Sequence, residues 1–297
     1  MTKNTSFVSV IIPAFNEESR LADCLNSLQH QTVRPLEVIV VDNNSTDVTA
    51  AIARNFKGVR VLREKKQGRA YARNAGLSAA KGSILARIDA DTIVPHDWVE
   101  QIQVLFEANP EADCVTGYGQ NRVGVTAKWA SNFCSWAYFT HSKAFFGVEM
   151  LWGSNMAIRK EIWEKAEHLC CKEDPTIHED QDISLALASV GARVLVVPSL
   201  RVSVDFNDTQ YFDKFLRYYQ MQFTTKLADH SHKRFLLKTR RNIPVIKRVY
   251  YELISWYSIP VYFLFSIIMS TKRGAVNAFK ESSIYWWYQK IKGDFAA

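Results

Sequence analysis

The sequence is poor in cysteine and has none at the spacing of a metal site. Disulfide frameworks use an even number of regularly spaced cysteines, and zinc sites use close cysteine or histidine pairs, so neither is indicated. We therefore expect reduced thiols, as in a cytosolic protein. The cysteines are Cys24, Cys114, Cys134, Cys170 and Cys171.

Several nucleotide-binding and targeting signatures are also missing. No G-x-x-x-x-G-K-[ST] occurs and no G-x-G-x-x-G follows the first apolar run, so a P-loop and a dinucleotide fold lack support. Residues 1–13 contain no long apolar stretch, and we expect no signal peptide. The 297 residues do have an apolar fraction of 47% and a formal charge of +7. These values indicate a globular domain, with or without an appendage, and an anionic partner such as nucleic acid or membrane.

Short apolar runs alternate with helical patterns in the first half of the chain. Nearly continuous β-branched runs are typical of strands in a sheet that is covered on both faces. The alternation predicts a parallel sheet with right-handed crossover helices. Ser45 or Thr46 is expected to cap one helix, and Asp97 and Glu100 are spaced like the capping box of another. The predicted strands are 8–13, 37–42, 59–63 and 83–89.

Two carboxylates, Asp89 and Asp91, close the last of these strands. Ligands of such sheets bind beyond the carboxyl ends of the strands, where acids repel one another unless a cation lies among them. A carboxylate pair at a strand end is therefore a candidate site for Mg²⁺ or Mn²⁺. The D-x-D spacing alone is not specific, since Asp180 and Asp182 repeat it, and the strand-end context distinguishes the first pair.

A phosphate-binding pattern lies between these strands. Gly68 precedes a helix predicted over 69–80, and Arg69 and Arg73 lie on one face of that helix. A helix N-terminus and guanidinium groups both attract phosphate. The alternative is two solvated arginines on a surface helix.

Six motifs in order resemble family 2 glycosyltransferases, which have the GT-A fold. "VSVIIPAFNEE", "VIVVDNNSTD", "GRAYARNAGLSAAKG" and "ARIDADT" are similar to the nucleotide-sugar half, and "GSNMAIRKEIW" with "HEDQDISLAL" is similar to the acceptor half. The resemblance covers residues 6–200. It implies a GT-A-like, Rossmann-type mixed sheet flanked by helices.

The resemblance implies a role for each matched donor residue. Asp42 would accept a hydrogen bond from the nucleobase, and Arg73 would approach the base or a phosphate. Asp91 would be the more direct ligand of Mg²⁺ or Mn²⁺, beside Asp89. The other donor-binding residues would be Pro13, Ala14, Asn16 and Glu17, in a turn against the nucleoside, with Gly68 and Arg69.

The resemblance also implies that Asp180, which closes "HED", is the catalytic base of an inverting enzyme. Glu179 and Asp182 would support it, or would simply be acids that favour a helix N-terminus. A base on the acceptor hydroxyl and a divalent ion on the leaving nucleoside diphosphate suffice for a single displacement. The acceptor side would include Gly153, Ser154 and Asn155.

The last part of the chain concentrates the positive charge beside an apolar stretch. Residues 232–248 hold seven Lys or Arg and no acid, and residues 249–270 are mostly apolar but have basic residues on both sides. We expect an interfacial helix on an anionic membrane surface, at the cytoplasmic face, with a single transmembrane helix or a pair of soluble helices as alternatives. Nucleic acid is not an expected partner, because the charge adjoins no recognition motif.

These patterns divide the chain into a glycosyltransferase domain, 1–230, and a C-terminal helical membrane-associating region, 231–297. The domain has a donor half, 1–95, and an acceptor half, 96–230. The expected reaction moves a hexosyl group from a nucleotide sugar, UDP favoured over GDP, to a hydroxyl of a lipid-linked or cell-surface glycan. Many members of the family carry S-x-R-R or Q-x-x-R-W near residue 200. Neither motif occurs after residue 200 in this sequence, which argues against a processive synthase. The alternatives are a polyprenyl-phosphate sugar transferase, a Mg-dependent nucleotidyltransferase and a non-catalytic membrane adaptor.

Overall fold

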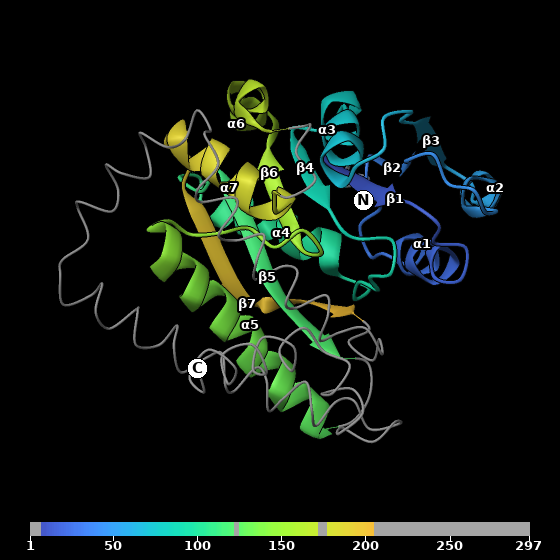
Figure 1. Cartoon of the computed structure of the whole chain (residues 1–297). Coiled ribbons are helices and arrows are strands. Elements are labelled where there is room, and N and C mark those ends of the chain that lie inside the picture. Colours follow the sequence, from blue (N-terminus) through green and yellow to red (C-terminus); the bar gives the residue numbers. More distant parts are fainter. Residues whose placement is uncertain (1–6, 122–124, 172–176, 205–297) are drawn as a thin grey trace, which may run out of the picture.

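The fold is an α/β sandwich built on a single mixed sheet, seen in a computed structural model of the chain (Figure 1). The structure describes residues 7–121, 125–171 and 177–204. No disulfide joins the cysteines whose side chains it describes.

Four parallel strands form the first half of the sheet, and helices connect them. Ala14 pairs with Asp42 at the ends of the first two strands, and Arg87 pairs with Ile11 at the end of the fourth. The four predicted strands are confirmed, two of them with the predicted bounds. In order the elements are β1 (Val8–Ala14), α1 (Leu21–Gln29), β2 (Glu37–Asp42), α2 (Thr49–Asn55), β3 (Val59–Arg63), α3 (Arg69–Ala79) and β4 (Ile84–Arg87).

The second half adds three strands and reverses one of them. The elements are α4 (Trp98–Ala108), β5 (Cys114–Asn121), α5 (Val125–Phe146), β6 (Met156–Arg159), α6 (Lys160–Ala166), the 3₁₀ turn η1 (Glu167–Leu169), α7 (Glu179–Ser189) and β7 (Val194–Val204). The sheet order is β3-β2-β1-β4-β6-β5-β7, and β6 runs antiparallel to β4 and β5. This arrangement confirms the predicted mixed sheet flanked by helices.

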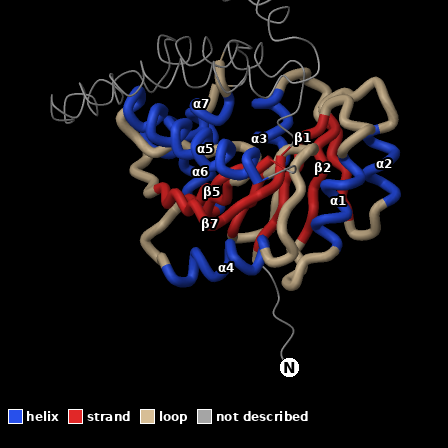
Figure 2. Tube along the Cα trace, turned by 90° about the horizontal axis from the view of Figure 1, so that it is seen from below, coloured by secondary structure: helices blue, strands red, loops and turns tan. Residues whose placement is uncertain are grey.

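Both faces of the sheet are buried, which explains the nearly continuous apolar strands. Along β1, Ile12 faces a core cluster that contains Trp98 of α4, whereas Ile11 faces a second cluster that contains Trp163 of α6. Figure 2 shows α4 on one side of the sheet and α3, α6 and α7 on the other. Burying each such aliphatic side chain contributes about 1.5–3 kcal/mol. The layers therefore fix where the strands end, and with them the loops that follow.

The predicted helix caps are wrong. α2 begins at Thr49, and its cap position is Val48, whereas the Ser45 hydroxyl accepts a hydrogen bond from the Asn16 N–H at 3.2 Å. Tertiary partners outcompete the local bonds that the spacing suggested.

The predicted capping box fails for the same reason. Asp97 stands at the cap position of α4 without a side-chain hydrogen bond to the helix. Glu100 accepts a hydrogen bond from the Thr32 hydroxyl at 2.8 Å instead of bonding the start of its own helix.

The predicted membrane-associating region, 231–297, lies outside the described residues, as does the domain boundary at residue 230. Among the helices that the structure does describe, none is both long and apolar enough to cross a membrane.

Candidate functional site

The loops that follow β1 and β2 are bonded to each other at the carboxyl edge of the sheet. The Asn16 amide oxygen accepts a hydrogen bond from the Thr46 N–H at 2.8 Å, and Asn16 takes a positive φ of 55° to reach it. The Glu17 N–H donates to the Thr49 hydroxyl at 2.8 Å. Asp42 is buried behind these loops and accepts a hydrogen bond from the Ser45 N–H at 3.2 Å. The predicted donor residues of the first two strands thus share one edge, which Pro13 and Ala14 lead into from β1.

Asn43 extends this edge to the loop before α3. Its side-chain oxygen accepts a hydrogen bond from the Gly68 N–H at 2.8 Å, and its amide donates to the carbonyl oxygens of Lys66 and Glu64 at 2.6 and 3.2 Å. Gly68 has φ 146°, a conformation that favours glycine. Asn43 therefore places the N-terminus of α3 beside the strand ends, a role that the sequence analysis missed because polar residues after strands are common.

The two acids of the D-x-D pair leave β4 in different surroundings. Asp89 accepts hydrogen bonds through one oxygen from the Arg87 Nη2 at 2.8 Å and through the other from the Ser154 hydroxyl. The Asp91 Oδ2 lies 3.6 Å from the Arg20 Nη1, and about a third of its side chain is exposed. Each of the two carboxylates has about a third of its side chain or more exposed, so a bound cation could reach either one.

The carboxylate pair fits a divalent cation only together with a substrate. Within the described residues no group of three or more His, Cys, Asp or Glu side chains could hold a metal ion. Mg²⁺ is usually held by one or two carboxylates together with substrate phosphates and water. Asp91 and Asp89 match that ligand set, and the donor would have to supply the remaining oxygens.

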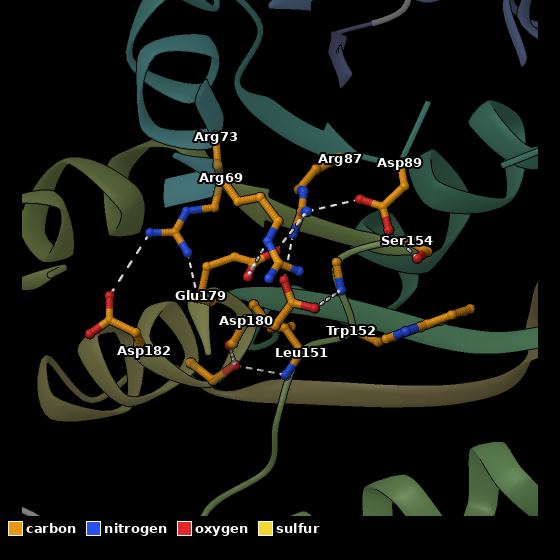
Figure 3. A network of polar contacts seen from close by, with 12 residues as sticks. Arg69, Arg73, Arg87, Asp89, Leu151, Trp152, Ser154, Glu179, Asp180 and Asp182 are labelled. Atoms are coloured by element: carbon orange, nitrogen blue, oxygen red, sulfur yellow. Dashed lines mark hydrogen bonds and ion pairs between the residues drawn. The ribbon is translucent and has the colours of Figure 1, made fainter. Parts of the chain in front are cut away.

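Arg87 connects Asp89 to the first turn of α7 (Figure 3). Its Nη1 donates to the Asp180 Oδ1 at 2.5 Å, and its Nη2 lies 3.4 Å from the Glu179 Oε1 as well as bonding Asp89. Burial lowers the pKa of Arg87, but the charges of Asp89, Asp180 and Glu179 more than offset this, so its pKa is raised. The guanidinium is thus a permanent positive charge, and we call its contacts with these three acids the Arg87 bridge.

Two further arginines reach α7 from α3. Arg73 is fully buried, donates to the Glu179 carbonyl oxygen and lies 3.9 Å from the Asp182 Oδ2. Arg69 is half exposed, with its Nε 3.6 Å from the Glu179 Oε2. Burial raises the pKa of Glu179. The nearby positive charges, first of all Arg69 and Arg87, lower it by more than burial raises it, so the pKa of Glu179 is lowered overall. Arg69 lies at the surface as the phosphate prediction requires, whereas Arg73 lies beneath α7 and its predicted donor contact stays a prediction.

The Gly153–Asn155 turn closes the site from the other side. The Gly153 N–H donates to the Asp180 Oδ2 at 2.9 Å. A methyl group on Gly153 would overlap the Arg87 guanidinium and the Asp180 carboxylate, so only glycine fits here. Asn155 is fully buried, accepts a hydrogen bond from the Trp98 Nε1 at 3.0 Å and donates to the Leu200 carbonyl oxygen at 2.9 Å. Asn155 therefore anchors the turn in the core, and its neighbours carry the contacts to the site.

These contacts close a ring that joins the two predicted halves of the domain. Arg87 and Asp89 belong to the donor half, and Gly153, Ser154 and Asp180 belong to the acceptor half. Arg87 was missed by the sequence analysis, although a cation inside the apolar run "SILARID" is a signal that such a residue has buried acidic partners.

With this geometry in view, the comparisons with known proteins assign a family. The model of glycosyl transferase family 2 matches residues 9–166, more than half of the chain. The chain belongs to glycosyl transferase family 2. The match contains the donor edge, the D-x-D pair and Gly153–Asn155 but ends before α7, so the family match does not reach Asp180.

Curated glycosyltransferases resemble part of the chain at higher sequence identity. Glycosyltransferase AglE of Haloferax volcanii is 40% identical over 108 residues, which cover 34% of this chain and 36% of that protein. Glycosyltransferase GlyG of Streptococcus pneumoniae is 35% identical over 118 residues, covering 38% of this chain and 39% of that protein. The matched segment thus spans little more than a third of the length of these relatives.

Solved structures share the fold at low sequence identity. A mannosyltransferase, PcManGT of Pyrobaculum calidifontis, in complex with GDP-Man and Mn²⁺, has a TM-score of 0.63 at 20% identity, covering 97% of this chain and 84% of that one. S. aureus TarS (residues 1–349) in complex with UDP-GlcNAc has a TM-score of 0.53 at 17% identity, covering 93% and 76%. The GT-A-like fold is thereby confirmed.

The buried Asp182 predicts a pH dependence of stability. Burial raises the pKa of Asp182 to about 6, although Arg73 and the Cys171 N–H favour its ionised form. An unfolded aspartate titrates near pH ~4. Between these values the folded protein binds more protons than the unfolded chain, so the free energy of unfolding falls as the pH rises. Above about pH 6 the protein carries the full cost of the ionised, buried carboxylate.

We expect Asp182→Asn, which keeps the shape but cannot ionise, to lack this loss of stability. Urea denaturation from pH 4 to pH 7 should show the variant gaining on the wild type by roughly 3 kcal/mol. Glu107→Gln, which changes an exposed carboxylate on α4, is the control and should gain far less. A difference between Asp182→Asn and wild type that stays constant with pH would contradict the prediction.

Proposed function

We propose that the chain transfers a hexosyl group from a nucleotide sugar to an acceptor hydroxyl with inversion at the anomeric carbon. The observation that carries the proposal is the Arg87 bridge, which holds a carboxylate of the donor edge, Asp89, and a carboxylate outside it, Asp180, on one guanidinium. A glycosyl transfer needs these two parts at fixed separation, because the leaving group and the incoming hydroxyl lie on opposite sides of the reacting carbon.

The donor edge offers the groups that a nucleoside diphosphate needs. Asp42 would accept a hydrogen bond from the nucleobase at the end of β2. Gly68 immediately precedes α3, whose N-terminus attracts phosphate, and the half-exposed Arg69 beside it carries a positive charge. Asp91 and Asp89 would hold a Mg²⁺ or Mn²⁺ ion, and this ion would neutralise charge on the departing diphosphate.

Asp180 is the group best placed to take the proton of the acceptor. Its carboxylate has one oxygen on Arg87 and the other on the Gly153 N–H, which leaves lone pairs on both oxygens for an incoming hydroxyl. A positioned carboxylate acting as general base accelerates such reactions by about 10²–10⁴-fold. One base on the acceptor hydroxyl suffices for a single displacement, from which inversion would follow.

The relatives support the class of donor and leave its choice open. PcManGT was solved with GDP-Man and Mn²⁺ and TarS with UDP-GlcNAc, so both nucleotides occur on this fold. We propose a UDP-sugar first and a GDP-sugar second. The acceptor is proposed to be a lipid-linked or cell-surface glycan, met at the cytoplasmic face of the membrane, where the basic residues 232–248 would bind anionic lipid.

Asp91→Asn tests the cation-dependent part of the donor site. It removes one charge from the proposed ligand pair, so UDP should bind at least about tenfold more weakly in the presence of Mn²⁺. Isothermal titration calorimetry of UDP with and without Mn²⁺ measures this. Asp23→Asn, an exposed change in α1, is the control. Unchanged UDP affinity in Asp91→Asn, with Mn²⁺ present, would contradict the metal assignment.

Asp180→Asn tests the catalytic part. Because Asp180 would act on the acceptor, the variant should bind UDP with Mn²⁺ as the wild type does but release UDP from a UDP-sugar at least about 100-fold more slowly. Asp113→Asn is a matched control, because the Asp113 carboxylate also accepts a hydrogen bond from a backbone N–H, that of Arg193 at 2.9 Å. Asp113 immediately precedes the first residue of β5 and, among the described residues, makes no hydrogen bond or ion pair with the site. Full activity of Asp180→Asn would remove it as the base. Release of pyrophosphate from a nucleoside triphosphate by the wild type would instead indicate nucleotidyl transfer.

A further inference from the structure

We infer that Arg87 is a positioning residue that sets the base candidate Asp180 in register with the donor edge at Asp89. The inference rests on the proposed function and deepens it. It names the side chain through which the donor edge fixes the position of the base.

The backbone around Arg87 allows it little freedom. Arg87 is the last residue of β4, paired with Ile11 of β1 on one side and with Met156 of β6 on the other. Its side chain is 3% exposed. Two neighbouring strands thus fix the backbone of Arg87, and the surrounding protein encloses its guanidinium. The guanidinium therefore cannot move toward one carboxylate without changing its contact with the other.

The two ends of the guanidinium face different parts of the site. Nη1 donates to Asp180 and Nη2 donates to Asp89, so the two carboxylates are bonded to nitrogens of one rigid plane. The side chain of Asp89 is 38% exposed, whereas that of Asp180 is 10% exposed. Asp89 is therefore the member that an incoming donor can reach, and Asp180 is the member that follows through the shared guanidinium.

The remaining contacts limit how these carboxylates can turn. The Ser154 hydroxyl bonds the second oxygen of Asp89, and the Gly153 N–H bonds the second oxygen of Asp180. Without Arg87, each carboxylate would keep only that second bond among the described residues and could rotate about it. A lysine cannot restore the link, because a single ammonium on a flexible chain lacks the planar fork that reaches two carboxylates.

The Nε of Arg87 is buried and has no hydrogen-bond partner in the described part of the chain. The hydrogen bonds of the guanidinium to Asp180 and Asp89 come from its two terminal nitrogens.

Arg87→Lys separates positioning from donor binding. Calorimetry gives the dissociation constant of UDP in the presence of Mn²⁺, and steady-state kinetics gives kcat and KM for hydrolysis of UDP-GlcNAc. If the wild type turns over only GDP-Man, then GDP-Man and GDP replace UDP-GlcNAc and UDP in the two measurements. We expect the dissociation constant to rise less than tenfold while kcat falls about 100-fold, the loss typical of a misplaced catalytic group.

Arg159→Lys is the matched control. Arg159, like Arg87, is the last residue of a strand of the sheet, but it is half-buried and donates to the backbone oxygens of Ala112 and Phe106 at 2.8 and 3.2 Å, away from the site. This variant should keep the wild-type kcat. Circular dichroism and thermal melts of both variants establish that they are folded.

Gly153→Ala attacks the same bridge from the opposite side. The added methyl group would overlap the Arg87 and Asp180 side chains, so the variant should show the same split, with kcat reduced and UDP affinity kept. It also serves as the test should Arg87→Lys fail to fold.

Two results would overturn the inference. The first is a wild-type kcat in folded Arg87→Lys or Gly153→Ala. The second is a loss of UDP affinity as large as the loss of kcat, which would place Arg87 in the donor site itself. A wild-type protein that binds UDP but turns over neither UDP-GlcNAc nor GDP-Man would instead count against the proposed function, so the two failures can be told apart.

Discussion

A buried guanidinium at the end of β4 is the constraint on which the rest of the site depends. Arg87 carries its charge inside the protein, and three carboxylates surround it. A buried charge is tolerated only where opposite charges and hydrogen bonds compensate for its lost hydration. The acids at the start of α7 are therefore drawn against β4, and the helix N-terminus that carries them faces the strand end. This one requirement brings together segments that lie about ninety residues apart in the chain.

The same constraint explains the small residues around it. Gly153 must lack a side chain because the guanidinium occupies the space where one would stand. Ser154 supplies a hydroxyl to Asp89, and Asn155 fixes the turn by bonding Trp98 and Leu200 in the core. The stretch "GSN" thus has one role per residue: space for the bridge, a bond to the donor edge and attachment to the core. The antiparallel strand β6 begins immediately after it and carries the turn to the centre of the sheet.

Much of this arrangement could be predicted from the sequence. The apolar strands are unambiguous, because a sheet buried on both faces demands continuous apolar runs, and the acids that follow them had to share one edge. The helix caps could not be predicted, since Ser45 and Glu100 bond partners distant in sequence, Asn16 and Thr32. Arg73 illustrates a further limit: its place on a helix face is readable, but whether that face meets solvent or α7 depends on how the chain folds back. Arg87 depends on the same long-range packing, and its partners lie on another element.

The most direct measurement is a crystal structure of the protein with a UDP-sugar analogue and Mn²⁺, with manganese located by its anomalous scattering. We expect manganese beside Asp91, the anomeric carbon on the side of the diphosphate that faces Asp180, and Arg87 still bonded to both Asp89 and Asp180. A complex in which the sugar lies away from Asp180, or in which Arg87 leaves Asp180 to bind the diphosphate, would contradict it.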